Sequence, residues 1–494
     1  MATLGNSIFP WPLKNQSLVI SKGLVNGEWR EGRTRFEVYE PSTGNVLDTV
    51  SGFNKEDVVE AIESAYTAFQ AFRHTTAKER AMILWKWHDL IRANADDLAK
   101  LISLENGKAL PDAVAEVNAT AGLAAWFAEE AVRSYGDVIP SSFPNTTVMT
   151  FREPVGVCAI VTPWNFPAMM VARKIAPAFA AGCSVVIKPP SETPFSVLAL
   201  AKLALDAGLP RKLLHVLPTK DRNAATELAR HPLVAKLSFT GSTPVGIMLT
   251  QLAAATMKRV SMELGGNAPF IVFEDADIDV AVQAAVACKF RASGQVCVSA
   301  NRLIVHESVV ADFATKLTAA VAKFRLGRGI DSGVTHGPLV NAAAVAKIDS
   351  HVKDALSRGA KLWVGGKRPE NINMGFFYEP TVLTNVPRDA LVAHDETFGP
   401  LGAIISFKTQ QEALDIANNT DLGLAGYFFS RNVGRVLEVA RALEVGMVGV
   451  NTGIMTAPET PFGGVKLSGL GREGSKHGIS EYQNIKSITI SHNF

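Results

Sequence analysis

Residues 155–188 read VGVCAIVTPWNFPAMMVARKIAPAFAAGCSVVIK, and this stretch decides the fold. The β-branched run over 155–161 predicts a strand, the apolar run over 169–181 a helix, and 184–188 a second strand. Strands that alternate with helices form a parallel, doubly wound sheet, because a parallel connection needs a crossover. The pattern continues with a predicted helix and a predicted strand over residues 196–207 and 234–239.

A second series of the same kind begins after Pro269, so we expect two α/β domains. Its predicted strands are 270–273, 302–305, 402–407 and 445–450, and its predicted helices are 279–292 and 309–324. Before both series, residues 78–108 form an amphipathic helical region. Two further strand patterns, 146–151 and 485–490, lie outside both series. Such strands often pair with another subunit, so we expect a homodimer or homotetramer.

Composition excludes several classes of protein. Of the 494 residues, 47% are hydrophobic and 19% are charged, which is typical of a folded chain. The formal net charge is only +2, so the protein has no strong positive electrostatic field that would attract nucleic acid or an anionic membrane. Residues 1–16 lack a targeting pattern and no apolar run of about 18 residues occurs, so we expect a cytoplasmic protein. The four cysteines and ten histidines show no metal-ligand spacing, so we expect no metal.

Glycine-rich segments offer two candidate phosphate sites. Residues 469–474 spell G-x-G-x-x-G, but no apolar strand precedes them and too little chain follows for a βαβ unit. Gly241 and Ser242 have better context, because they lie where the strand over 234–239 meets a predicted helix. The helix N-terminus offers free N–H groups there, and glycine lets a phosphate approach. An ordinary turn capped by Ser242 accounts for the same residues.

Three residues are candidates for chemistry. Cys297 lies in a turn of small residues, whereas the other cysteines lie in apolar patterns. A reactive thiol needs access and a partner that stabilises the thiolate, although packing explains any single cysteine. Glu263 lies among apolar and small residues, where desolvation raises the pKa of a carboxyl toward that of a general base; a surface glutamate ending a strand is the alternative. Asn165 follows a predicted strand, and its amide can donate to an oxyanion or cap the next helix.

At these residues the chain resembles the aldehyde dehydrogenase superfamily, and within it the succinate-semialdehyde dehydrogenases. Eight motifs carry the resemblance, in the order of the family and across nearly the whole chain. They are Asn26–Trp29, Pro154–Val157, Pro163–Pro167, Phe239–Ser242, Glu263–Gly266, Gly294–Cys297, Glu396–Pro400 and Pro461–Gly464.

The resemblance implies oxidation of an aldehyde to an acid with a nicotinamide cofactor. Cys297 attacks the carbonyl, while the Asn165 amide and the Cys297 backbone N–H hold the oxyanion. Hydride transfer then leaves a thioester on sulfur, which water activated by Glu263 hydrolyses. Lys174 matches a family lysine implicated in proton relay. A covalent adduct confines the carbon beside the cofactor, and donors act most strongly on the charge of the intermediate.

The resemblance also implies a set of cofactor contacts. They are Thr162, Trp164, Lys188, Gly241, Ser242, Gly265, Glu396 and Phe398. Relatives that prefer NAD carry a glutamate three residues after the lysine equivalent to Lys188, where this chain has Ser191. Because that carboxylate would repel a 2′-phosphate, we expect Lys188 and Ser191 to hold the phosphate, with NADP preferred and NAD the alternative. The neighbouring Glu192 argues against the preference.

The substrate class rests on Arg173 and Arg291, which match the succinate-semialdehyde subgroup. Guanidinium groups bind carboxylates in bidentate fashion, so an aldehyde with a distal acid would be oriented over the thiol; structural salt bridges are the alternative. Thr456 occupies the loop where relatives place a serine for the substrate carboxylate. This departure leaves glutarate or a longer semialdehyde open. Ser299 replaces the second cysteine of a redox-sensitive pair found in the subgroup.

The implied fold has two Rossmann-like parallel-sheet domains and a small β extension for oligomerisation. We assign 1–140 and 160–268 to a cofactor-binding domain, 269–462 to a catalytic domain, and 141–159 and 480–494 to oligomerisation strands. The predicted activity is NAD(P)-dependent oxidation of succinate semialdehyde. The alternatives are a dehydrogenase for glutarate or 2-oxoglutarate semialdehyde, one of broader specificity, a thioester hydrolase, and a cofactor-binding protein with little turnover.

Overall fold

The βαβ unit predicted over 155–188 is present in the computed structural model, which describes residues 11–492. Strands β7 (Val157–Val161) and β8 (Ser184–Lys188) pair in parallel, and α5 (Pro167–Ala181) joins them across the sheet. Helix α5 ends at Gly182, whose φ of 97° is left-handed, and this turn brings the chain back into β8. The first ten residues of the range 1–140 and the last two of 480–494 lie outside the described part.

The first unit is built on an eight-stranded sheet in the order β2-β1-β9-β8-β7-β10-β11-β21. Its five central strands are parallel, and antiparallel strands close both edges. The strands are β1 (Gly23–Val25), β2 (Glu28–Arg30), β7 (Val157–Val161), β8 (Ser184–Lys188), β9 (Leu214–Val216), β10 (Val234–Thr240), β11 (Arg259–Glu263) and β21 (Gly469–Leu470).

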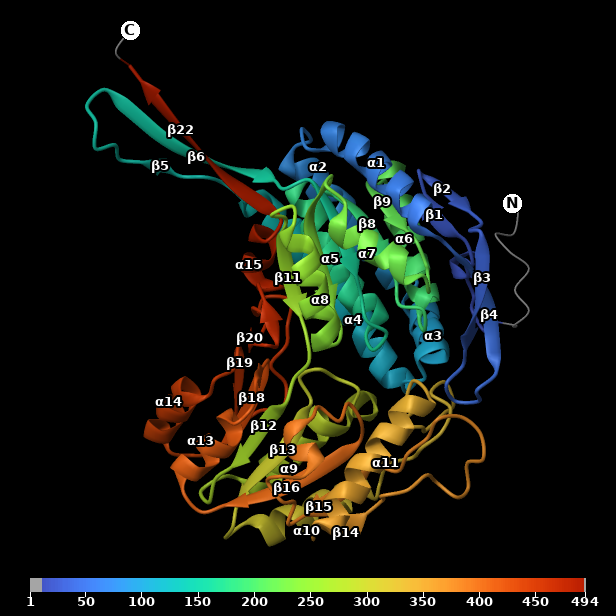
Figure 1. Ribbon diagram of the computed structural model, residues 1–494, viewed down its shortest axis with the longest axis vertical. Coiled ribbons are helices and arrows are strands. Elements are labelled where there is room, and N and C mark those ends of the chain that lie inside the picture. Colours follow the sequence, from blue (N-terminus) through green and yellow to red (C-terminus); the bar gives the residue numbers. More distant parts are fainter. Residues whose placement is uncertain (1–10, 493–494) are drawn as a thin grey trace.

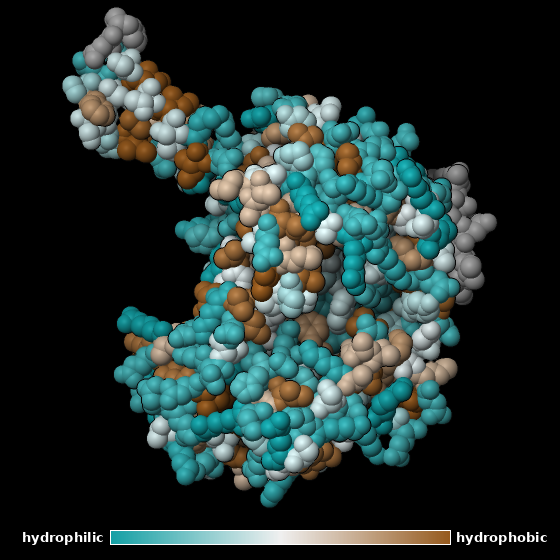
Figure 2. All heavy atoms as spheres, in the orientation of Figure 1, coloured by the Kyte–Doolittle hydropathy of each residue, from teal (hydrophilic) through white to brown (hydrophobic). Residues whose placement is uncertain are grey.

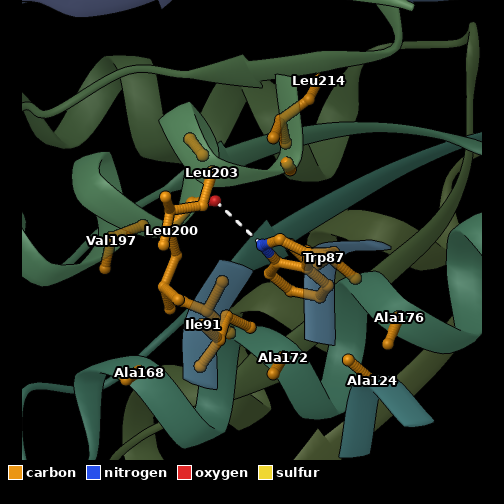
Figure 3. Packing of buried hydrophobic residues seen from close by; sticks show 14 of the residues in the cluster. Trp87, Ile91, Ala124, Ala168, Ala172, Ala176, Val197, Leu200, Leu203 and Leu214 are labelled. Atoms are coloured by element: carbon orange, nitrogen blue, oxygen red, sulfur yellow. Dashed lines mark hydrogen bonds between the residues drawn. The ribbon is translucent and has the colours of Figure 1, made fainter. Parts of the chain in front are cut away.

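Eight helices of this unit accompany the sheet (Figure 1). They are α1 (Lys55–Phe72), α2 (Ala77–Ala93), α3 (Ala95–Asn106), α4 (Leu110–Arg133), α5 (Pro167–Ala181), α6 (Pro194–Asp206), α7 (Arg222–Arg230) and α8 (Thr243–Ala254). The helical region predicted over 78–108 is two helices that meet at Asn94. Trp87 is buried between α2, α5 and α6, and its Nε1 donates to the Leu200 carbonyl at 3.1 Å (Figure 3).

The second unit contains a seven-stranded sheet in the order β14-β15-β16-β13-β12-β18-β19, in which all strands but β14 run parallel. The strands are β12 (Ala268–Val272), β13 (Ala300–His306), β14 (Lys361–Val364), β15 (Thr381–Thr384), β16 (Leu401–Phe407), β18 (Ala425–Phe429) and β19 (Met447–Val450). Its helices are α9 (Ile278–Ala285), α10 (Val310–Val321), α11 (Ala342–Ser357), α12 (Leu391–His394), α13 (Gln410–Asn418) and α14 (Val433–Ala442). The two parallel sheets confirm the predicted α/β class.

The helix predicted over 279–292 is shorter than expected. Helix α9 ends at Ala285, a wider turn follows over Val286–Phe290, and a tight turn follows over Arg291–Gly294. Ala292 and Ser293 have left-handed φ values of 48° and 55°, which no helical residue adopts. The apolar pattern continues through this break, so hydrophobic periodicity alone could not locate it.

A β arm projects from the first unit (Figure 1). It consists of β5 (Val138–Ile139), β6 (Thr146–Pro154) and β22 (Gln483–Ser491), with β6 paired antiparallel to both neighbours. The two strand patterns outside the main series therefore pair with each other within one chain. The arm begins at Val138, before the predicted range 141–159, and β6 ends at Pro154. Strand β7 starts at Val157 and belongs to the eight-stranded sheet, so the arm also ends earlier than this range.

The remaining elements are short or peripheral. They are β3 (Thr34–Tyr39), β4 (Val46–Gly52), β17 (Leu422–Gly423), β20 (Val465–Lys466), α15 (Ser475–Ser480), and single turns at Gln16–Leu18 and Arg211–Leu213. Across residues 11–492, every helix is too short or too polar to cross a lipid bilayer.

Candidate active site

The predicted site residues converge where the carboxyl ends of the first sheet face the second unit. Asn165 follows β7, Ser242 follows β10 and Glu263 ends β11, while Cys297 and Glu396 come from the second unit. A cavity of about 240 Å³ lies among them. Its lining is Pro163, Trp164, Asn165, Met170, Thr240, Gly241, Ser242, Leu264, Gly265, Cys297, Lys347, Glu396 and Phe398.

The loop that carries Cys297 is held in a conformation that few residues adopt. Ala292, Ser293 and Gly294 are left-handed in succession, with φ values of 48°, 55° and 73°. The Ser293 hydroxyl donates to the Gly337 carbonyl at 2.8 Å, and Asn165 Nδ2 donates to the Gln295 carbonyl at 3.0 Å. These contacts fix the strained turn, so the half-buried Cys297 is placed at the cavity by backbone geometry.

The Cys297 thiol is protonated in this arrangement. Burial, the Glu396 carboxylate and the Glu263 carboxylate raise its pKa to about 12, and Arg173 acts in the opposite direction. The sequence led us to expect a partner that stabilises the thiolate. The structure instead places two carboxyl groups near the sulfur, so a thiolate forms only when a negative charge beside it is neutralised.

Glu263 has the desolvated setting that its apolar neighbours predict. The residue is buried, and neither carboxylate oxygen has a hydrogen-bond partner among residues 11–492. Burial, followed by the nearby Glu473, raises its pKa well above the ordinary value. A carboxyl whose pKa is raised in this way keeps a proton more readily than an exposed glutamate does, so it can act in proton transfer.

Lys174 lies behind Glu263 in a buried polar cluster. Its Nζ donates to a carboxylate oxygen of Glu473 and, at 3.0 Å, to Ser238 Oγ. Glu473 was not predicted from the sequence. It lies in the glycine-rich segment 469–474, whose literal motif drew attention to the glycines and away from the acid.

Two predicted substrate residues meet in a separate cavity of about 220 Å³. Arg173 is buried, and its Nε and Nη1 have no hydrogen-bond partner. Its guanidinium carbon lies 4.3 Å from the centre of the Phe462 ring, and that of Arg291 lies 5.6 Å from the Phe166 ring. Within residues 11–492 neither arginine forms an ion pair, which argues against structural salt bridges. The lining is Asp112, Ala115, Glu116, Ala119, Leu123, Phe166, Met169, Arg173, Arg291, Thr456, Ala457 and Pro458.

The residues expected to hold a dinucleotide form a suitable cradle. A Cβ on Gly241 would lie 2.4 Å from the Phe239 ring, and one on Gly265 would lie 3.2 Å from a Glu396 carboxylate oxygen. Ser242 is the N-cap residue of α8, but its side chain makes no capping hydrogen bond. The hydroxyl and the helix N-terminus therefore remain available to a phosphate, which disfavours the simple capping alternative. The Trp164 and Phe398 rings pack edge to face, 5.6 Å apart.

Lys188 and Ser191 lie outside the lining of that cavity. Lys188 ends β8, and its Nζ donates to the Pro189 carbonyl at 3.1 Å. Ser191 Oγ donates to a Glu192 carboxylate oxygen at 3.2 Å. Glu192, which argues against a preference for NADP, therefore contacts Ser191 directly. Thr162 is buried, and its Oγ1 has no hydrogen-bond partner.

We did not predict from the sequence the ion pair that supports Asn165. Lys108 Nζ donates to Glu116 at 2.6 Å and to the Asn165 carbonyl at 2.5 Å. Glu116 Oε1 accepts from the backbone N–H groups of Ala168 and Met169 at 2.9 and 3.2 Å. Glu116 therefore caps α5, and the Asn165 amide is not needed for that purpose. A glutamate on the buried periodic face of α4 was the available signal.

Comparisons with known proteins agree along nearly the whole chain. The model of the aldehyde dehydrogenase family matches residues 29–488. The chain is 50% identical over 475 residues to a succinate-semialdehyde dehydrogenase [NADP(+)] of Schizosaccharomyces pombe, covering 95% of each chain. It is 49% identical over 482 residues to a glutarate-semialdehyde dehydrogenase of Pseudomonas putida, covering 97% of this chain and 99% of that protein. A crystal structure of succinate-semialdehyde dehydrogenase from Burkholderia pseudomallei superposes with a TM-score of 0.96 at 50% identity, covering 97% and 100%.

The pKa of Cys297 predicts how the free protein reacts with iodoacetamide. Only the thiolate reacts, so the alkylation rate at Cys297 should still be rising at about pH 10, beyond the ordinary thiol midpoint of about 8.5. Glu396→Gln removes a negative charge near the sulfur and should move the profile to lower pH. Mass spectrometry of the Cys297 peptide measures the rate. The exposed Glu370→Gln is the control, and a wild-type midpoint at or below about 8.5 contradicts the expectation.

Proposed function

The chain belongs to the aldehyde dehydrogenase family, and on that premise we propose that it oxidises an aldehyde with a distal acid group, succinate semialdehyde first, using NADP or NAD. The observation that carries the substrate class is the pair of arginines, Arg173 and Arg291, which line one cavity and form no ion pair in the described part of the chain. Glutarate semialdehyde is the second candidate, because Thr456 lines the same cavity and the chain is nearly as similar to a protein named for that substrate.

In the proposed mechanism, Cys297 Sγ bonds to the aldehyde carbon. Burial and the Glu396 and Glu263 carboxylates raise the pKa of the thiol; when Glu263 is ionised and accepts the thiol proton, a negative charge is removed from beside the sulfur and the thiolate is favoured. The second N–H of Asn165 Nδ2, whose first donates to the Gln295 carbonyl, and the backbone N–H of Cys297 are the donors for the oxyanion. When bound, the nicotinamide supplies the hydride acceptor.

Glu263 acts as the base that activates water to hydrolyse the thioester on Cys297 and release the acid product. Its two unpaired oxygens and its raised pKa suit a group that receives a proton from water and passes it on. Lys174 and Glu473 form the buried polar cluster behind it, so we assign them to the path of that proton. Hydrolysis breaks the carbon–sulfur bond and returns Cys297 to the thiol.

We assign the eight-stranded unit to cofactor binding and the seven-stranded unit to catalysis. Thr162, Trp164, Gly241, Ser242, Gly265, Glu396 and Phe398 are the proposed dinucleotide contacts. Lys188 and Ser191 are proposed to bind a 2′-phosphate, after Ser191 exchanges its contact with Glu192. The names of relatives from Schizosaccharomyces pombe and Escherichia coli include NADP(+), which supports the preference. No disulfide occurs within residues 11–492, which suits the reducing cytoplasm.

Substitution of Arg173 tests the substrate class. Arg173→Gln should raise KM for succinate semialdehyde by about 10- to 100-fold, because a charged hydrogen bond to the carboxylate is lost. KM for butanal, which has the same chain length without the acid, should change little. Aldehyde-dependent reduction of the cofactor, followed by absorbance, is the assay. Arg441→Gln, on the exposed face of α14, is the control.

Equal losses on both aldehydes would contradict the proposed role of Arg173. An absence of cofactor reduction with any aldehyde would instead support the hydrolase or the binding protein.

Substitution of Ser191 tests the cofactor preference. Ser191→Glu should lower kcat/KM for NADP about tenfold or more relative to that for NAD, because the new carboxylate repels the 2′-phosphate. Ser191→Gln, which has the same size and no charge, should have a much smaller effect. A wild-type kcat/KM many-fold higher for NAD than for NADP would overturn the preference.

We propose that the arm joins copies of the chain into a homodimer or homotetramer. Figure 2 shows apolar side chains concentrated on the arm, where Val138, Phe143 and Ile485 are 79%, 71% and 62% exposed. The double variant Ile485→Asp and Ile490→Asp should lower the mass measured by light scattering, whereas valine at both positions should not. A wild-type monomer would contradict this proposal.

A further inference from the structure

The cavity that holds Arg173 and Arg291 also contains an acid. Asp112, in the first turn of α4, lines this cavity. It also lines a second cavity of about 220 Å³, which shares Arg291 and Thr456 with the first. The two cavities therefore adjoin at these three residues, and Asp112 shares the lining of the first cavity with both arginines.

Asp112 is fixed in position. Its Oδ2 accepts the backbone N–H of Ala292 at 2.9 Å, at the start of the left-handed turn that leads to Cys297. The residues from 11 to 492 provide no hydrogen-bond or ion-pair partner for Oδ1. The carboxylate thus supports the turn with one oxygen and leaves the other free.

The charges that line the two cavities can be added. Glu116 is neutralised by its buried ion pair with Lys108. Burial lowers the pKa of His336, in the second cavity, to about 4, so this imidazole is uncharged. Two guanidinium groups and the Asp112 carboxylate remain, and none of the three forms an ion pair with another group in the described chain. The acid-binding region therefore carries one net positive charge.

We propose that Asp112 determines the charge class of the substrate, so that the site accepts aldehydes with one negative charge and rejects those with two. This inference rests on the proposed function. A monoanion neutralises the region, whereas a dianion leaves one negative charge uncompensated in a buried setting and close to Asp112, which is unfavourable. With a neutral residue at position 112, the two arginines would match a dianion.

Two analogues of succinate semialdehyde separate charge from shape. In one a sulfonate replaces the carboxylate, and in the other a phosphonate does. Both groups are tetrahedral, but at about pH 8.5 the sulfonate carries one negative charge and the phosphonate carries mostly two, as phosphate-type groups do above a second pKa of about 6. Wild type should show a higher kcat/KM for the sulfonate.

Asp112→Asn is the decisive variant, because the amide oxygen still accepts from Ala292 while the charge is lost. In this variant, kcat/KM for the phosphonate analogue divided by kcat/KM for the sulfonate analogue should rise about tenfold. Glu129→Gln removes a half-buried acid, paired with Arg133, from the same helix and should leave the ratio unchanged. Asp112→Ala, which also removes the hydrogen bond, should additionally lower kcat on every aldehyde, butanal included.

An unchanged ratio in Asp112→Asn would overturn the inference. So would an equal shift in Glu129→Gln, because the effect would then be a general property of the surface charge. Failure of the proposed function would differ from failure of this inference, because wild type would then oxidise neither succinate semialdehyde nor its sulfonate analogue.

Discussion

The strained turn before Cys297 is the constraint on which the site depends. Three consecutive left-handed residues, 292–294, are unfavourable for a free chain, and a Cβ on Gly294 would lie 2.2 Å from the Gly399 carbonyl oxygen. The turn persists because both units hold it. Asp112 and Asn165 bind it from the first unit, and Gly337 binds it from the second. The nucleophile is therefore positioned by the packing of one unit against the other.

The same packing leaves several polar groups unsatisfied. Two oxygens of Glu263 and two nitrogens of Arg173 are buried without partners, and each such group costs about 1–3 kcal/mol or more when charged. Arg173 lines a cavity, whereas other buried charges of the same region are paired, as in Lys108 with Glu116 and Lys174 with Glu473. The contrast separates a side chain that is available to a ligand from side chains that hold the site in shape.

The sequence predicted the layers and the convergence of motifs, but not the supporting contacts. Strands β7, β8 and β16 could be predicted because their apolar runs are short and bounded by turns, and Gly241 and Ser242 because they follow such a strand. The break in the helix after Ala285 could not be predicted, because the apolar pattern runs through it. The roles of Asp112, Glu116 and Glu473 depend on contacts across 52 to 299 positions of sequence, which local patterns do not encode.

The protonation of the site also follows from its architecture. Burial raises the pKa of Cys297, and the Glu396 and Glu263 carboxylates raise it further. A thiol that stays protonated reacts slowly with adventitious electrophiles and oxidants, since the thiolate is the reactive form. The carboxyls that suppress the thiolate are the ones that a bound cofactor and a transferred proton would rearrange or neutralise. The sulfur therefore becomes reactive when its charge environment changes, and Arg173, which we propose to orient an acidic aldehyde, lowers the pKa of the same thiol.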